Sequence, residues 1–203
     1  QIEIDYVFWQ DNGTWNNPTV QIWVNAPSNP VQAVVSQNSA TPSGASVPGI
    51  IEVLRFNATA YGVDLDIHGL NLEIVSSDNN GSLWNTCDEL GDGTNGEGGI
   101  QLYFADDMET SHGLFGTSSL AGPCANPANG DEPVTNAGNS WWNYILPAGE
   151  TAVFVITTET TGASSVNDDT IMVTLISLTV TEVESGLEVP VVGLPVPGGT
   201  LQF

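Results

Sequence analysis

The chain carries almost no positive charge. Arg55 is its single Lys or Arg residue, against 24 Asp and Glu residues, which gives a formal net charge of −23 over 203 residues. Such a surface repels nucleic acid and anionic lipid and cannot form networks of ion pairs. Charged residues make up only 12% of the chain, so the rest of the polar surface consists of Asn, Ser, Thr, Gln and Gly. We therefore expect an extracellular or cell-surface protein with no nucleic-acid partner.

Side chains suited to catalysis are also scarce. The absence of lysine excludes Schiff-base chemistry, a lysine general base and Lys–Asn isopeptide bonds. His68 shares the polar phase of its strand with Asp64 and Asp66, so we expect it to face outward. His112, the other histidine, stands in a predicted loop, and no nucleophile-elbow motif supports a Ser-His-Asp triad. We expect no enzymatic activity, with a small secreted hydrolase as an alternative.

Long apolar runs and helical periodicity are missing as well. No run of 18 apolar residues is present, so we expect no membrane span. Hydrophobic residues nevertheless reach 40%, with 22 Gly and 12 Pro between short stretches rich in Val, Ile and Thr. This pattern predicts an all-β fold, an immunoglobulin-like or jelly-roll β-sandwich with long Gly/Asn-rich loops and exchangeable terminal strands. We expect one domain over residues 1–203, with N-terminal strands in 1–48, a sandwich body in 49–183 and an apolar C-terminal strand in 184–203.

Alternation of apolar and polar residues locates the strands. The expected strands are residues 2–8, 19–25, 31–35, 50–61, 63–67, 70–74, 100–104, 141–146, 151–158 and 170–183. In residues 50–61, one face should hold Ile50, Leu54, Phe56, Ala58 and Ala60. The apolar phase changes after Gly69, which predicts a β-bulge there.

Two long polar regions, residues 76–99 and 105–139, interrupt this pattern and are predicted to be loops around the strand at 100–104. Each holds one of the two cysteines, Cys87 and Cys124. An even number of cysteines in an apparently exported chain predicts a disulfide between them, although two buried thiols are the alternative. Such a bond would stabilise the fold by roughly 3–4 kcal/mol in the chain-entropy model.

The same loops concentrate acidic side chains. The candidate metal ligands are Asp88, Glu89, Asp92, Asn95 and Glu97 in one loop and Asp106, Asp107 and Glu109 in the other. Oxygen ligands on flexible loops suit Ca²⁺, but the spacing is not that of an EF-hand. We favour acidic loops solvated by water and sodium, with Ca²⁺ binding as the alternative, so we expect no required cofactor.

Two further features concern the surface. Asn12, Asn57 and Asn80 begin sequons for N-glycosylation. Six Trp residues could stack on surface glycans, although we favour core or subunit contacts for them because no pair has a diagnostic arrangement.

Two stretches resemble signatures of prokaryotic surface sandwich modules. They are residues 53–60, VLRFNATA, and residues 146–154, LPAGETAVF, with the sequence NDDTI at 167–171 in the place of a later turn. In those modules an early strand ending in "LTA" is followed by a "PAGET" turn and a "GDTI" turn. The resemblance covers roughly residues 50–183 and implies a sandwich fold and an extracellular setting. It implies no particular activity.

Both ends of the chain are apolar and strand-like. The candidate exchange residues are Ile2, Ile4, Tyr6 and Phe8 at the N-terminus and Leu187, Val189, Val191, Leu194, Val196, Leu201 and Phe203 at the C-terminus. An apolar terminal strand can complete the sheet of a neighbouring copy, and such contacts propagate into filaments. In outline the chain resembles the subunits of archaeal and bacterial donor-strand filaments, including bundling pili, camelysin-type biofilm fibres and calcium-dependent cannulae. We expect a homopolymeric extracellular filament; a secreted or surface module that binds carbohydrate or calcium is the alternative.

Overall fold

The computed structural model describes residues 30–77, 100–115, 134–137, 142–160 and 169–203. Nearly all of them belong to one compact unit, Val31–Phe203, which begins just after a separate unit formed by residues 1–30. Every regular element in the described ranges is a β-strand. Within those ranges no helix is long and apolar enough to cross a membrane. The all-β prediction is therefore confirmed, whereas the strands predicted at residues 2–8 and 19–25 lie outside the described residues.

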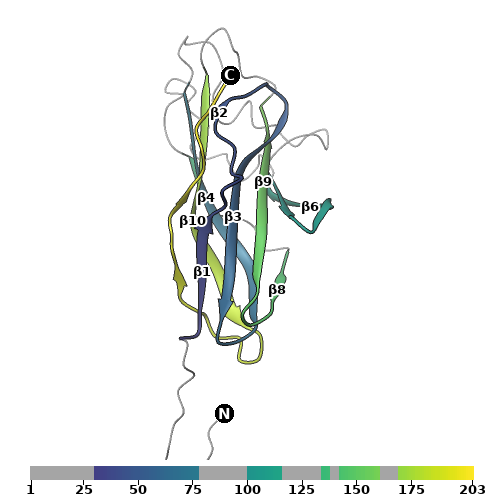
Figure 1. Cartoon of the computed structure of the whole chain (residues 1–203), viewed down its shortest axis with the longest axis vertical. Coiled ribbons are helices and arrows are strands. Elements are labelled where there is room, and N and C mark those ends of the chain that lie inside the picture. Colours follow the sequence, from purple (N-terminus) through teal and green to yellow (C-terminus); the bar gives the residue numbers. More distant parts are fainter. Residues whose placement is uncertain (1–29, 78–99, 116–133, 138–141, 161–168) are drawn as a thin grey trace, which may run out of the picture. The chain divides into compact units, whose positions relative to one another are not determined.

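The strands form two sheets that pack face to face as a β-sandwich (Figure 1). The first sheet has the order β11 (Val191–Val192), β1 (Gln32–Gln37), β3 (Ile50–Tyr61), β9 (Thr151–Glu159), β5 (Ile100–Phe104) and β6 (Asp107–Phe115). The second has the order β2 (Gly44–Ala45), β13 (Leu201–Gln202), β10 (Thr170–Glu182), β4 (Leu65–Ser77) and β7 (Val134–Ala137). Beside this order, β12 (Val196–Pro197) pairs with β10, and β8 (Tyr144–Leu146) pairs with β4.

The antiparallel pair β4–β10 is the longest ladder of the second sheet. It runs from the Ser77–Thr170 pair to the Leu65–Glu182 pair, with a register shift where β4 passes from Gly69 to Ile67. Residues 65 and 67 are buried before this shift, and residues 70, 72 and 74 are buried after it. The bulge predicted at Gly69 is thus confirmed, and it lets one strand keep its apolar side chains on the core side although their spacing changes.

Strand β3 also has a register shift, in its ladder with β9, and here the predicted buried face is only partly confirmed. Leu54, Phe56, Ala58 and Ala60 are fully buried as expected, but Ile50 is 71% exposed. The ladder with β9 changes register between Glu52 and Leu54, so the alternation does not continue back to Ile50. The prediction for Ile50 was wrong because a bulge turns its end of the strand to the other face.

The region predicted to be one long loop, residues 105–139, is also partly strand. Strand β6 pairs with β5, and β7 pairs with β4. Both strands are rich in polar residues, so the alternation of apolar residues that locates the other strands is weak in them. An existing sheet edge supplies their hydrogen bonds, which is a tertiary effect that local patterning does not report.

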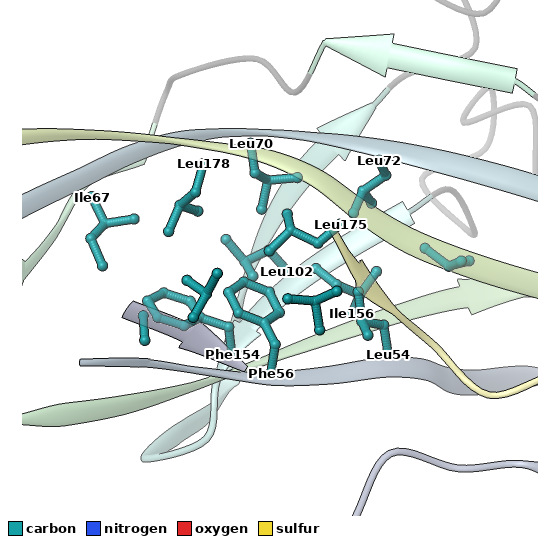
Figure 2. Close-up of a cluster of buried hydrophobic side chains, with 14 of the residues drawn as sticks. Leu54, Phe56, Ile67, Leu70, Leu72, Leu102, Phe154, Ile156, Leu175 and Leu178 are labelled. Atoms are coloured by element: carbon teal, nitrogen blue, oxygen red, sulfur yellow. The ribbon is translucent and has the colours of Figure 1, made fainter. Parts of the chain in front are cut away.

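The core lies between the two sheets and is centred on stacked aromatic rings. Phe56 and Phe154 stack with ring centroids 5.0 Å apart, and Leu70, Leu72 and Leu175 face them from the second sheet (Figure 2). At one side of the core, Phe104, Trp142 and Tyr144 add three more rings, each in contact with another ring of the group. Trp142 is buried, as expected for a core or contact Trp.

Candidate strand-exchange site

The last seventeen residues, 187–203, which we call the C-terminal segment, lie against the edge of β10 that β4 leaves free (Figure 1). Contact with β10 occurs at three places: a bridge between Glu188 and Thr181, the β12 pairing, and the β13 pairing. The backbone N–H groups of Val189 and Gly198 donate to the carbonyls of Val180 (3.0 Å) and Val173 (2.8 Å). The segment therefore completes the second sheet at this edge.

Between these places the C-terminal segment crosses to the first sheet. Strand β11 pairs in parallel with β1, and the Ala33 N–H donates to the carbonyl of Pro190 at 2.9 Å. The segment then returns to β10 and ends beside β2, where Thr200 and Gln202 accept hydrogen bonds from the backbone of Gly44 and Ser46. One segment thus closes one side of the sandwich by hydrogen bonding to both sheets. Of its prolines, Pro197 lies in the two-residue strand β12, and Pro190 and Pro195 lie outside the strands, so their missing N–H groups interrupt no long ladder.

The predicted exchange residues of the C-terminal segment differ in burial. Four are buried and belong to the core: Val189, Val196, Leu201 and Phe203. Val191 and Leu194 pack partly against it, whereas Leu187 is 67% exposed. The structure therefore places six of the seven against the core along the free edge of β10. We call the space that they fill, bounded by β10 on one side and by β1 and β2 on the other, the cleft between β1 and β10. It excludes Leu187, which belongs to the preceding turn.

That turn joins β10 to the C-terminal segment over residues 183–187. The N–H groups of Gly186 and Glu182 donate to the carbonyls of Glu182 (2.8 Å) and Leu187 (2.9 Å), and Gly186 adopts a φ of +66°. The hydroxyl of Ser185 donates to the carboxylate of Glu182 at 2.6 Å. Glycine fits the left-handed conformation without a steric penalty, so the turn returns the chain to its own β10 with no strained residue at this position.

Three other glycines lie where the C-terminal segment passes closest to the rest of the sandwich. A Cβ at Gly193, whose φ is +99°, would overlap the carbonyl oxygen of Val35. A Cβ at Gly198 would overlap the carbonyl oxygen of Val173 and lie 2.9 Å from that of Val53. A Cβ at Gly199 would overlap the carbonyl oxygen of Pro42. The cleft thus has three points at which only a residue without a side chain fits. Sequence reasoning missed these glycines, although their spacing within an apolar, proline-rich tail was visible.

A cavity of about 250 Å³ remains beside the C-terminal segment where it leaves β10 for β1. Its walls are formed by Leu178, Thr179, Val180, Glu188, Val189 and Val191.

The remaining sequence-predicted sites are described only in part. Ile2, Ile4, Tyr6, Phe8, Asn12, Asn80, both cysteines and the acidic group at 88–97 lie outside the described residues. Asn57 lies within β3, and its side-chain oxygen accepts a hydrogen bond from Asn38 at 2.7 Å. His68 is half-buried in β4, with Nδ1 3.3 Å from the carbonyl of Asp66.

The second acidic group lies at the connection between β5 and β6. Asp107 accepts hydrogen bonds at Oδ1 from the N–H groups of Glu109 (3.2 Å) and Thr110 (3.1 Å). In the described part of the chain, no three His, Cys, Asp or Glu side chains are grouped closely enough to hold a metal ion. Asp107 thus has a structural role in ordering the start of β6.

The acids of this region also affect Tyr144. Partial burial raises the pKa of its phenol above the ordinary value, and the carboxylates of Asp106 and Glu150 raise it further. Neutral Tyr144 packs against Phe104 and Phe154, with ring centroids 4.6 and 5.4 Å away. The protonated phenol is therefore the form that this side of the sandwich favours.

The only Lys or Arg residue of the chain forms an ion pair. Arg55 donates from Nε and from a terminal nitrogen to the two carboxylate oxygens of Glu52, at 2.9 and 2.6 Å. This hydrogen bonding raises the pKa of Arg55. The bulge between Glu52 and Leu54 places both side chains on the same face of the first sheet, and the pair neutralises the one positive charge there.

Two of the sequence signatures meet near the end of the sandwich where β3 leads into β4, since residues 53–60 run along β3 towards it, whereas the described part of NDDTI begins β10 at the other end of its ladder with β4. The PAGET stretch forms the turn between β8 and β9, with Gly149 at a φ of +82° and its N–H donating to Ala60 at 2.9 Å. Asp64 accepts a hydrogen bond from the N–H of Ala148 at 2.8 Å. Compared with known proteins, the chain matches no family model and none of the curated sequences.

Proposed function

We propose that the protein is the structural subunit of an extracellular filament that polymerises by strand complementation between copies. One observation carries the proposal. The unit Val31–Phe203 is a sandwich with its last strands in place, and the thirty residues before it include two stretches, 2–8 and 19–25, whose alternation predicts strands. A sandwich joined to an additional strand-forming segment is the arrangement that lets one copy complete a sheet of the next. Because donor and acceptor are different surfaces, the contact continues into a filament when the rotation between copies does not close a ring.

The side chains available to such a junction contribute a free energy of about the size that association costs. Burial of four large apolar side chains such as Ile2, Ile4, Tyr6 and Phe8 contributes on the order of 6–12 kcal/mol of transfer free energy. Association costs about 4–15 kcal/mol in lost translational and rotational freedom, which is of similar size. Main-chain hydrogen bonds along the added strand therefore decide the net stability, as expected for addition to a sheet edge.

The charge of the chain predicts how assembly depends on conditions. Copies that each carry −23 repel one another, so screening ions or divalent cations such as Ca²⁺ favour side-by-side packing. The neutral polar remainder of the surface suits an extracellular or cell-surface polymer. In this proposal the protein has no catalytic activity and its main partner is a second copy of itself.

Size-exclusion chromatography and negative-stain electron microscopy of the purified chain test this proposal. We expect filaments in the void volume, longer at 150 mM salt or with added calcium and shorter with a chelator at low salt. A chain that stays monomeric under all these conditions contradicts the filament. Glycan binding by that monomer would instead support a surface carbohydrate-binding module.

A paired substitution tests the role of the N-terminal strand. Replacing Ile4 and Tyr6 by Ser should abolish growth, because these residues share the apolar phase of the strand. Replacing Glu3 and Asp5 by Ser is the matched control, which removes two side chains of the polar phase and should leave growth intact. Equal effects of the two pairs would show that the alternation of this strand has no role in assembly.

A further inference from the structure

We propose that three glycines, Gly193, Gly198 and Gly199, restrict the cleft between β1 and β10 to the C-terminal segment, and that the short turn before this segment keeps each cleft filled by the segment of its own chain. The inference rests on the proposed function in one respect: it assigns the joining of copies to the N-terminal strand and excludes exchange of the C-terminal segment.

The first argument is steric. At each of the three glycines, an added Cβ would overlap a backbone carbonyl oxygen of β1, of β10 or of the connection before β2. Backbone atoms of β1 and β10 are held by their ladders and cannot move away as the end of a flexible side chain can, so a larger residue is excluded at Gly193 and Gly198. At Gly199 it would meet the backbone of Pro42, which the hydrogen bond from Gly44 to Thr200 holds beside the segment. An occupant of the cleft must therefore have glycine at one position and again five and six residues later.

The second argument comes from the rest of the sequence. The thirty residues before Val31 contain a single glycine, Gly13, so no stretch of them satisfies this spacing. Residues 2–9 contain none. The N-terminal strand cannot take the path of the C-terminal segment, even though its apolar alternation suits a sheet edge.

The third argument concerns competition between copies. The turn at residues 183–187 connects the C-terminal segment directly to β10, and two backbone hydrogen bonds close that turn. A tether of this length holds the segment near its own cleft at an effective concentration of roughly millimolar. The segment of another copy makes the same contacts without this advantage, so the cleft stays filled by the segment of its own chain.

A disulfide staple in the full-length chain tests the inference. Thr170 and Gln202 are directly opposed in the β10–β13 pair, at the Cα separation of antiparallel partners, which suits a disulfide. The variant T170C/Q202C is purified as monomer and oxidised, which locks the C-terminal segment in its own cleft. Filament growth is then started by salt or calcium and followed by light scattering.

We expect the oxidised variant to grow at a rate within about twofold of the reduced variant. Growth abolished by oxidation and restored by reduction would overturn the inference, because it would show that the C-terminal segment must leave its cleft. The unsubstituted chain with and without reductant is the control for Cys87 and Cys124. Failure of every form to grow would contradict the proposed function instead.

A second measurement tests the glycine requirement without any filament. In monomeric G198A, we expect amide hydrogen exchange in residues 187–203 to rise at least tenfold while the β4–β10 ladder stays protected. The control is G186N, a substitution in the adjoining turn, because no atom lies within 4 Å of an added Cβ at Gly186. Unchanged exchange in G198A, or equal increases in both variants, would overturn the steric argument.

Discussion

The two edges of β10 are paired in different ways. On one edge, β4 pairs along the length of the strand, from Thr170 to Glu182. On the other, the C-terminal segment makes three short contacts, separated by an excursion to β1. The long ladder needs only apolar residues in the correct phase, which many sequences could supply. The short contacts need glycines at set positions, so one edge provides general stability and the other admits a particular segment.

The largest expected effect on the free energy of unfolding comes from truncating a buried leucine at each of these edges. Leu72 of β4 is fully buried and Leu201 of β13 is 3% exposed. Truncation of a buried leucine costs about 2–5 kcal/mol, and the cost falls where the surroundings can relax. We expect L72A to cost about 4 kcal/mol and L201A about 2 kcal/mol, because the end of the chain can shift into the space. Urea unfolding followed by circular dichroism measures both, with Q202A as an exposed control; equal costs would remove the distinction between the edges.

A smaller effect on stability is expected from alanine substitutions at two glycines, which distinguish the cost of steric overlap from that of backbone conformation. Gly193 and Gly44 have similar positive φ angles, +99° and +87°, but only Gly193 has backbone atoms within reach of an added Cβ. We expect G44A to cost about 1 kcal/mol from its left-handed conformation. G193A should cost about 1–3 kcal/mol more, in the range of overpacked sites. Thermal unfolding of the two variants gives the difference, and a melting temperature for G193A equal to that of G44A would contradict the close approach to β1.

The ion pair on the first sheet should contribute less to the free energy of unfolding than the contacts at either edge of β10. Arg55 and Glu52 are partly exposed, so their interaction is expected to contribute about 0.2–1 kcal/mol despite its two hydrogen bonds. A double-mutant cycle with R55Q and E52Q measures the coupling. It should weaken as salt increases, and a coupling that does not change with salt would argue against a screened surface pair.

The smallest effect concerns Tyr144 and appears only at high pH. The folded chain raises the pKa of this phenol, so above about pH 10 the unfolded chain releases the proton more readily than the folded chain does. Stability should therefore fall as pH rises through this range, and Y144F should remove part of the fall while behaving like the parent chain at pH 7. Melting temperatures at pH 7, 9 and 11 test this, and identical pH profiles for both chains would exclude Tyr144 as a cause.

Particular residues show how far the sequence could be interpreted. The bounds of β3 and β5 were predicted to the residue, and the change of phase at Gly69 correctly indicated a bulge. The bulge of β3, between Glu52 and Leu54, left no such mark, because Val53 and Leu54 are both apolar and both buried. Strands β6 and β7 were missed because polar edge strands form where a neighbouring sheet offers hydrogen bonds. For the candidate site, the apolar residues of the C-terminal segment were identified from sequence, whereas its glycines were not.

Alternation and composition by themselves determined that the chain is a β-sandwich with a nearly cation-free surface, because the side-chain period of two is a local property of a strand. Only the tertiary structure decided that the C-terminal segment fills a cleft of its own sandwich and that three glycines set the fit. Which backbone carbonyls face those glycines depends on strands β1 and β10, which are more than 130 residues apart in the sequence. A constraint that arises where distant backbones meet leaves no periodic signal along the chain.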